Sequence, residues 1–170
     1  MPNAPAQAAN FKKLSISSNS GGGSVDMSSV TPEFRYYESI LSNVTTAALV
    51  VSETGYQMDG NSDVGERVDI SIEDNYGNIL DLSRTGMYVN RVKNATPGTQ
   101  SDMFMLDLCS KEYFANEQTR VVKRYEGKIS DNVINILTQV LKADAAVLDV
   151  DSTAIEYNFI GNDRKPLYIC

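Results

Sequence analysis

The sequence has no histidine among its 170 residues, and it has only two cysteines. Histidine is the commonest general base near neutral pH and the commonest metal ligand. Its absence excludes zinc catalysis and the Ser-His-Asp and Cys-His nucleophile systems in their usual forms. Cys109 lies in the apolar run MFMLDLC, where a reduced, packed thiol is expected, and Cys109 and Cys170 are too few for a disulfide framework. The sequence therefore predicts a protein that is not an enzyme and has no catalytic, cofactor-binding or metal-binding residues.

Targeting and phosphate-binding signals are also missing. The N-terminus has no basic region followed by an apolar stretch, and no window approaches the ~18 consecutive apolar residues of a membrane span. The sequence contains no P-loop, GxGxxG or GxSxG motif. The glycines 21–23 are followed by Ser24 and not by a strand-to-helix turn, so a phosphate cradle is not expected. These features predict a cytoplasmic chain with no membrane association.

What is present is an acidic chain with enough apolar residues to form a core. Apolar residues make up 42% of the sequence, the formal net charge is −7 and the pI is near 4.6. Phosphates repel an acidic chain, which disfavours duplex binding as its main role. The best candidates for a local basic patch are Arg120, Lys123 and Arg124. We interpret the surrounding segment, 110–128, as a sheet edge or connector that contacts protein and not nucleic acid.

One loop carries four side chains with oxygen ligands: Asp59, Asn61, Asp63 and Glu66. The D-x-N-x-D spacing begins like a calcium loop. The pattern then fails, because Val64 stands where the tight-turn glycine belongs and Ile70 where the bidentate glutamate belongs. A solvated hairpin loop is the better interpretation. Turn formation explains a second acidic group, which comprises Asp144, Asp149 and Asp151.

Three further carboxylates lie in or beside apolar strands: Glu38, Glu73 and Asp107. Two of them facing each other would provide a general acid and a general base, so a carboxylate-dependent hydrolase is one alternative function. Outward-facing strand positions explain all three more simply.

Segments with β-type patterns follow one another from residue 11 to residue 109. They are 11–17, 34–41, 44–52, 67–74, 79–83, 87–94 and 102–109. Asn75–Asn78 is turn material that predicts a hairpin, and Thr96–Gly98 predicts another turn. Short strands at this spacing imply a small antiparallel barrel or sandwich.

Three strands show which face is apolar. In RVDISIED (67–74), one row holds Val68, Ile70 and Ile72, and the other holds Arg67, Asp69, Ser71 and Glu73. In the strand 102–109, the inner row comprises Phe104, Leu106 and Leu108. The segment 34–41 is partly apolar on both faces, which suits a strand in a closed or two-layered sheet. Phe34, Tyr36 and Ile40 lie on one face, and Arg35, Tyr37 and Leu41 lie on the other.

The hydrophobic period changes after residue 128. Apolar side chains recur at helical spacing in ISDNVINILTQVLK (129–142), at Val133, Ile134, Leu137, Val140 and Leu141. Ser130 is the expected N-cap, with Ile129 and Ile134 as a hydrophobic staple. AIEYNFIG (154–161) predicts a further strand, and Pro166 stands where a helix could begin. The apolar ending RKPLYIC predicts that this chain is a fragment of a longer protein.

Three stretches carry a resemblance to a known family. EFRYYESILSNVTTAALVV, then RVDISIEDNYGN, then FMLDLCSKEYFANEQTRVVKRYEGKISDNVINIL resemble the N-terminal portion of baseplate hub proteins of contractile-tailed phages. The resemblance is particularly to cyanophage-type relatives of the T-even group. The resemblance covers roughly residues 11–170, and the pieces around 34–42 and 110–137 are the most specific.

The resemblance implies a fold and a domain layout. The fold would be mainly β with α, a tail-tube-like antiparallel barrel or sandwich followed by an amphipathic helix and a second α+β region. Residues 1–10 would be disordered, 11–114 would form the barrel domain, and 115–170 would begin a second, inserted domain that is truncated here. No cofactor is implied.

The resemblance also implies a role. Hub proteins form homotrimers whose barrels make a pseudo-hexameric ring between the tail tube and the central spike. The partners would be the tail tube and tube-initiator proteins, the spike protein and the baseplate wedge proteins. The protein would belong to the baseplate of the virion tail and would assemble in the host cytoplasm. DNA would pass through the lumen without specific binding, repelled by an acidic wall that includes the Arg67–Glu73 outer row.

The main alternative is a β-sandwich binding module of a fibre or adhesin that recognises a surface glycan. Its platform would be three exposed aromatic side chains, Tyr56, Tyr76 and Tyr88.

Overall fold

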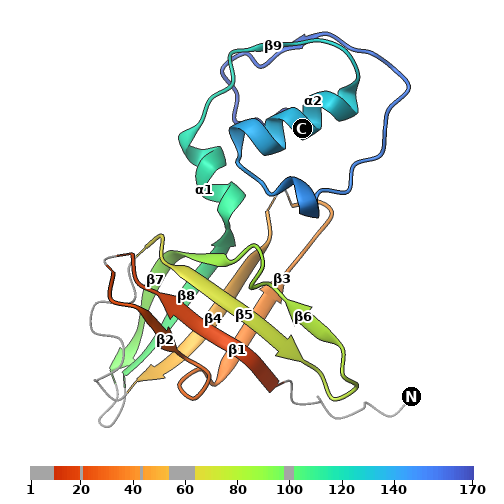
Figure 1. The fold of residues 1–170 in the computed structure, drawn as a ribbon. Helices are drawn as coiled ribbons and strands as arrows, with labels where there is room; N and C mark the ends of the chain where they lie inside the picture. Colours follow the sequence, from red (N-terminus) through yellow and green to blue (C-terminus); the bar gives the residue numbers. More distant parts are fainter. Residues whose placement is uncertain (1–9, 20, 43, 54–63, 98–101) are drawn as a thin grey trace. The chain divides into compact units, whose positions relative to one another are not determined.

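The computed structural model describes residues 10–19, 21–42, 44–53, 64–97 and 102–170 (Figure 1). The chain divides into two compact units, Met1–Ser110 and Lys111–Cys170, and each is described by itself. Residues 1–9, for which the sequence predicts disorder, lie outside the described residues.

The first unit is built from eight antiparallel strands. They are β1 (Asn10–Ser17), β2 (Ser24–Asp26), β3 (Glu33–Tyr37), β4 (Thr46–Glu53), β5 (Arg67–Glu73), β6 (Ile79–Asp81), β7 (Met87–Pro97) and β8 (Asp102–Ser110). The sheet order is β2-β1-β5-β7-β8-β4-β3, with β6 paired to β5. The predicted hairpin between β5 and β6 is confirmed. There Asp74 accepts hydrogen bonds from the backbone N–H groups of Tyr76 and Asn78, and Gly77 adopts a φ of +83° that favours glycine.

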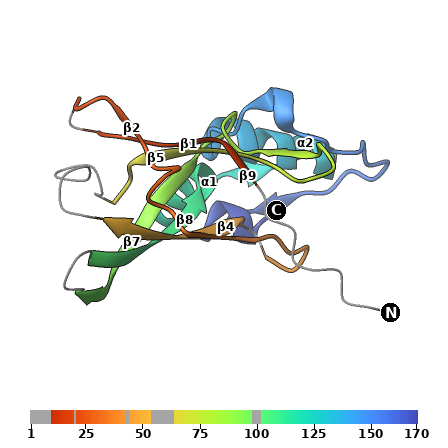
Figure 2. The ribbon, with the colours of Figure 1, turned by 90° about the horizontal axis from the view of Figure 1, so that it is seen from below.

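The sheet of the first unit folds over on itself. Figure 2 shows β1, β2 and β5 in one layer and β4, β7 and β8 in the other. The segment 27–31 joins the two, because the Met27 N–H donates to the Leu14 carbonyl (2.8 Å) and the Ser52 N–H donates to the Val30 carbonyl (2.7 Å). No pairing joins the end strands β2 and β3 among the described residues. The predicted mainly β fold is confirmed, while closure into a barrel stays a prediction.

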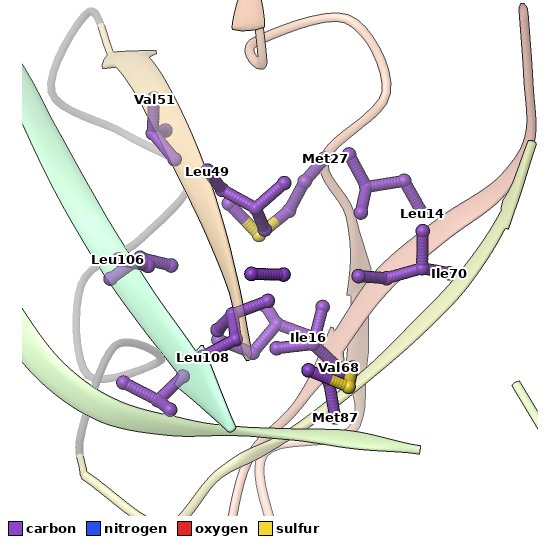
Figure 3. Packing of buried hydrophobic residues seen from close by; sticks show 12 residues of the cluster. Leu14, Ile16, Met27, Leu49, Val51, Val68, Ile70, Met87, Leu106 and Leu108 are labelled. Carbon is purple, nitrogen blue, oxygen red and sulfur yellow. The ribbon is translucent and has the colours of Figure 1, made fainter. Parts of the chain in front are cut away.

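The core of the first unit fills the space between these layers (Figure 3). Its buried side chains are Leu14, Ile16, Met27, Ala47, Leu49, Val51, Val68, Ile70, Met87, Val89, Leu106 and Leu108. The predicted inner rows of β5 and β8 are confirmed, since Val68, Ile70, Leu106 and Leu108 are fully buried. Ile72 and Phe104 complete these rows as half-buried side chains packed against the core.

One strand of the first unit is shorter than predicted. β3 ends at Tyr37, so Ile40 and Leu41 are not on strand faces and are 102% and 90% exposed. The Ser42 N–H donates to the Ser39 carbonyl (3.0 Å), and this turn ends the strand before Ile40. Phe34 and Tyr36 do pack against the core, as the alternation predicts.

The second unit has short elements around a small core. They are α1 (Lys111–Gln118), β9 (Arg124–Tyr125), α2 (Ile129–Asn135), the π-helix η1 (Ile136–Val140), the 3₁₀ helices η2 (Ala145–Val147) and η3 (Pro166–Tyr168), and β10 (Phe159–Ile160). β9 pairs with β10, and the Tyr125 and Phe159 rings stack with centroids 5.0 Å apart. Val121, Tyr125 and Ile136 are the buried centre of this core. Pro166 does begin a short helix, as predicted.

Helix α1 was not predicted. The interpretation of 110–128 as a sheet edge or connector is wrong for Lys111–Gln118, which is helical. The helix has no apolar stripe that would mark it in the sequence, and its one buried side chain is the polar Asn116. The Asn116 side chain accepts a hydrogen bond from the Leu167 N–H (2.9 Å), a contact with a residue far along the chain.

The predicted helix after residue 128 is confirmed, but its start and its buried face differ from the prediction. Helix α2 begins at Ile129, and Ser130 is a buried residue of the helix and not its N-cap. The Ser130 N–H donates to the Thr153 hydroxyl, and the Thr153 N–H donates to the Ser130 hydroxyl (both 3.2 Å). Both staple residues, Ile129 and Ile134, are exposed. A tertiary contact therefore takes the serine that local capping would use.

The π-helix η1 explains the altered face. A π-turn holds one residue more than an α-turn, so it shifts the side chains that follow it around the helix. The fully buried apolar residues are Ile136 and Leu141, whereas Leu137 is half-buried. The predicted strand 154–161 is reduced to Phe159–Ile160, plus a single bridge between Lys128 and Glu156.

Candidate assembly surface

The free edge of β3 is the first feature of a candidate assembly surface. Among the described residues of the first unit, β3 pairs with β4 on one side and ends the sheet on the other. Its outward side chains are exposed, and Arg35 Nε donates to Glu33 at 2.5 Å. An exposed strand edge carries backbone groups that can pair with another chain, and charged side chains restrict which chain can do so. The edge therefore suits a selective protein contact.

The loop after β3 presents two apolar side chains to solvent. We call residues 38–42 the tip. The Leu41 N–H donates to the Ser39 hydroxyl (3.2 Å), and the Ser42 hydroxyl donates to the Val44 carbonyl (2.8 Å). These bonds hold a turn from which Ile40 and Leu41 project, each at least nine-tenths exposed. Burying one such side chain contributes roughly 1.5–3 kcal/mol, so the tip is a ready anchor for a partner.

Two hollows border this surface. One, of about 410 Å³, lies on the outer face of the sheet, where it is lined in part by Arg35, Tyr37, Lys93 and Asp107. The other, of about 290 Å³, lies at the base of the tip and includes Glu38. The edge, the tip and the hollows form a contoured polar and apolar surface, which is the mixture typical of protein interfaces.

The three candidate catalytic carboxylates do not share a site. Glu38 accepts a hydrogen bond from the Tyr36 hydroxyl (3.2 Å) at the tip. Asp107, on β8, pairs with Lys93 of β7 (2.6 Å). Glu73, at the end of β5, pairs with Lys12 of β1. Each carboxylate has its own partner on a different element, and Glu38 and Asp107 line different hollows. The geometry favours the outward-facing interpretation.

The outer row of β5 is neutralised by β1. Asp69 accepts hydrogen bonds from Lys13 Nζ (2.7 Å) and Arg67 Nε (2.8 Å). Burial alone would raise the pKa of Asp69, but these two hydrogen bonds outweigh burial and lower its pKa. With Lys12 on Glu73 and with Asp81 opposite Ser71, this face holds three cations and three carboxylates. The expectation of an acidic, DNA-repelling wall therefore finds no support at this row.

The tyrosine platform of the alternative function is not assembled. Tyr88 lies opposite Arg67 at the start of β5, and Tyr76 follows the far end of the same strand. The two ends of β5, Arg67 and Glu73, are six residue steps apart, which is about 20 Å along a strand. A single sugar ring cannot span that distance. Tyr56 lies outside the described residues.

The predicted basic patch is dispersed. Arg124 pairs with Glu126 (2.8 Å), and the Lys123 ammonium lies 5.4 Å from the Tyr125 ring centroid. Arg120 instead lines a different pocket, described below. The triglycine at 21–23 joins two antiparallel strands, β1 and β2, and does not lead from a strand into a helix.

The calcium-like loop lies mostly outside the described residues. Asp59, Asn61 and Asp63 are not described, while Glu66 is buried at 1% exposure and is not solvated as expected. In the second acidic group, Asp144 accepts a hydrogen bond from the Ala146 N–H (2.9 Å), which confirms turn formation there. Within the described ranges, no cluster of three or more Cys, Asp or Glu side chains is placed to hold a metal. Nor does any described helix have the length and apolar character needed to cross a membrane.

Comparisons with known proteins rest on fold alone. No protein-family model matches the chain, and no curated protein matches it in sequence. The prophage tail protein gp18 of Listeria monocytogenes aligns with 93% of this chain and 44% of its own length, at 12% identity and a TM-score of 0.52. An Escherichia coli component of the type VI secretion system, itself similar to T4 tail proteins, aligns with 98% of this chain and 40% of its own length, at 7% identity and a TM-score of 0.48. The chain thus spans less than half the length of either structure, and it shares its mainly antiparallel β fold with a phage tail protein.

Proposed function

We propose that the protein is a structural component of a phage tail, and that within the tail it belongs to the baseplate hub. The observation that carries the proposal is the fold shared with the Listeria prophage tail protein. Segments 34–42 and 110–137 resemble hub proteins, and this resemblance narrows the proposal from a tail protein in general to a baseplate hub protein. The exposed tip and the free β3 edge supply surfaces that an assembly protein needs.

In this proposal the chain works as part of a homotrimer. Residues 11–114 form a tail-tube-like barrel and 115–170 begin a second domain, so three chains build a pseudo-hexameric ring. The ring joins the tail tube and tube-initiator proteins to the central spike, and wedge proteins surround it. Sheet edges that are free in one chain are covered by its neighbours, as closed rings require. The protein has no catalytic task in this role.

Deletion and complementation in a phage that carries this gene test the proposal. Without the gene, electron microscopy of lysates should show no complete tails, and the wild-type gene should restore them. A gene with Ile40→Asp and Leu41→Asp should fail to restore them, because two charges replace the apolar anchors of the tip. Both positions are exposed, so circular dichroism should show a folded variant.

A matched control separates the tip from exposed apolar surface in general. Tyr76 is 77% exposed at the β5–β6 turn, and Tyr76→Asp should restore tails as well as wild type does. Normal tails in the deletion strain would overturn the proposal. Sheath, tube or spike genes beside this gene would support it, whereas unrelated neighbours together with a glycan-array hit that depends on Tyr76 would favour the binding module.

A further inference from the structure

The second unit contains a cationic pocket that the sequence does not reveal. The pocket, of about 260 Å³, is lined by Arg120, Asp163, Arg164, Lys165 and Tyr168. Its lining residues come from two stretches more than forty positions apart in the chain. We call this feature the arginine pocket.

Backbone contacts hold the two stretches together. The Val121 N–H donates to the Arg164 carbonyl (2.9 Å), and the Asp163 N–H donates to the Val121 carbonyl (3.0 Å). Helix η3 is tied to α1 through the Leu167 N–H and the Asn116 side chain (2.9 Å). The cations therefore sit on a braced framework and not on a free loop.

Lys165 and Arg120 both interact with Glu117, since the charge of each lowers the pKa of that carboxyl, whereas Arg164 has no carboxylate partner in the part of the chain that the structure describes. Lys165 pairs with Glu117 (2.5 Å). Arg120 donates to the Thr119 carbonyl (3.1 Å), and the Arg164 guanidinium carbon lies 4.7 Å from the Tyr168 ring centroid. A guanidinium placed over an aromatic ring still has N–H groups available for a carboxylate or phosphate.

Charge is divided unevenly between the units. Residues 1–110 carry seven basic and thirteen acidic side chains, a net charge of −6, whereas residues 111–170 carry eight and nine, a net charge of −1. The second unit is thus the part of one copy that repels the acidic first unit of another copy least. A nucleic acid carries a much denser charge, and the three cations of the pocket are few against it.

We propose that the arginine pocket of one copy receives the tip of a second copy. The tip brings an exposed carboxylate, Glu38, beside two exposed apolar side chains. The pocket brings the Arg164 guanidinium over the Tyr168 ring, with Arg120 and Lys165 in the same lining, and these three cations outnumber the one lining carboxylate, Asp163. Charge and apolar surface are therefore complementary. Because the two surfaces differ, the contact is head-to-tail, the kind that closes into rings. The inference rests on the proposed ring assembly and names the surfaces that form it.

Sedimentation velocity of the full chain over a range of concentrations tests the inference. Wild type should self-associate, and the association should weaken from 50 mM to 500 mM NaCl because salt screens the charges. Arg164→Glu should raise the dissociation constant at least about tenfold at low salt, since like charges would then meet. Glu38→Arg should do the same, and the double variant that carries both changes should recover most of the affinity.

Arg124→Glu is the matched control, because it changes the net charge equally in the same unit outside the pocket. It should leave association unchanged. Equal weakening by Arg124→Glu, no recovery in the double variant, or association that Arg164→Glu leaves intact would each overturn the inference. So would a wild type that is monomeric at every concentration, or a labelled oligonucleotide whose binding Arg164→Glu abolishes. The complementation experiment tests the proposed function separately. If tail formation requires the gene but genes carrying the pocket substitutions still restore tails, the proposed function stands and only this inference is overturned.

Discussion

Gly161 is the position where one added methyl group should have the largest local effect in the second unit. A Cβ at Gly161 would lie 2.4 Å from the Val121 carbonyl oxygen and 2.6 Å from Val121 Cγ1. Carbon and oxygen in contact normally stay about 3.3 Å apart, so the two backbones must separate by about 1 Å. Gly161 has no positive φ, so alanine suits its backbone conformation and the penalty is steric.

The expected loss of stability follows from the hydrogen bonds that join the two backbone segments at this contact. The Gly161 N–H donates to the Lys123 carbonyl (3.0 Å), and two further bonds of 2.9 and 3.0 Å join Val121 to Arg164 and Asp163. A separation of about 1 Å takes all three beyond hydrogen-bond range. Each hydrogen bond contributes roughly 0.5–1.5 kcal/mol to stability. Alanine offsets about 0.4–1 kcal/mol of this loss, because it lowers the conformational entropy of the unfolded chain relative to glycine. Gly161→Ala should therefore lower the unfolding free energy of this unit by about 0.5–4 kcal/mol.

Native-state hydrogen exchange measures this loss where it arises. Peptides covering 119–125 and 159–165 should lose protection in Gly161→Ala, while peptides from β1, β5 and β8 keep theirs. Val121→Ala in the same background removes Cγ1 but leaves the carbonyl, so it should not rescue the variant. A loss below about 0.5 kcal/mol, or rescue by Val121→Ala, would refute the backbone clash.

Three other predictions concern the first unit and the thiols. Leu49→Ala, at a fully buried position, should cost about 2–5 kcal/mol in urea unfolding, and a cost below about 1 kcal/mol would contradict the packing of Figure 3. The lowered pKa of Asp69 means that its ion pairs stabilise the fold above the ordinary aspartate pKa and lose that effect as the pH falls through the folded value. In Asp69→Asn, the midpoint of urea unfolding should change less between pH 5 and pH 2 than it does in wild type. The same pH dependence of the midpoint in both proteins would argue against a stabilising role for those ion pairs. Burial raises the pKa of Cys109 to about 12, whereas Cys170 is exposed, although partial burial raises its pKa too. A disulfide reagent at pH 8 should therefore modify only Cys170 in the native protein, and slowly, whereas in urea it should modify both thiols. Modification of both thiols in the native protein would disprove the burial of Cys109.

Local patterns in the sequence determined most of the first unit. Alternation with a period of two depends only on neighbouring residues, so Val68, Ile70, Leu106 and Leu108 could be assigned to the core without knowing the strand order. The Asn75–Asn78 turn is equally local, because Asp74 and Gly77 supply its hydrogen bonds and its positive φ from within the turn. Composition alone excluded histidine-dependent chemistry.

Contacts between distant residues decided the rest. Helix α1 carries no apolar stripe, and Asn116 owes its burial to a bond with Leu167. Ser130 leaves the expected cap position because Thr153 bonds to it. The arginine pocket exists only because Val121 pairs with Arg164, and the tip is apolar and exposed because a turn ends β3 early. Apart from the tip, whose Ser39–Ser42 turn is local, each of these features joins residues whose separation in sequence no local period can encode. The arginine pocket therefore came from the tertiary structure.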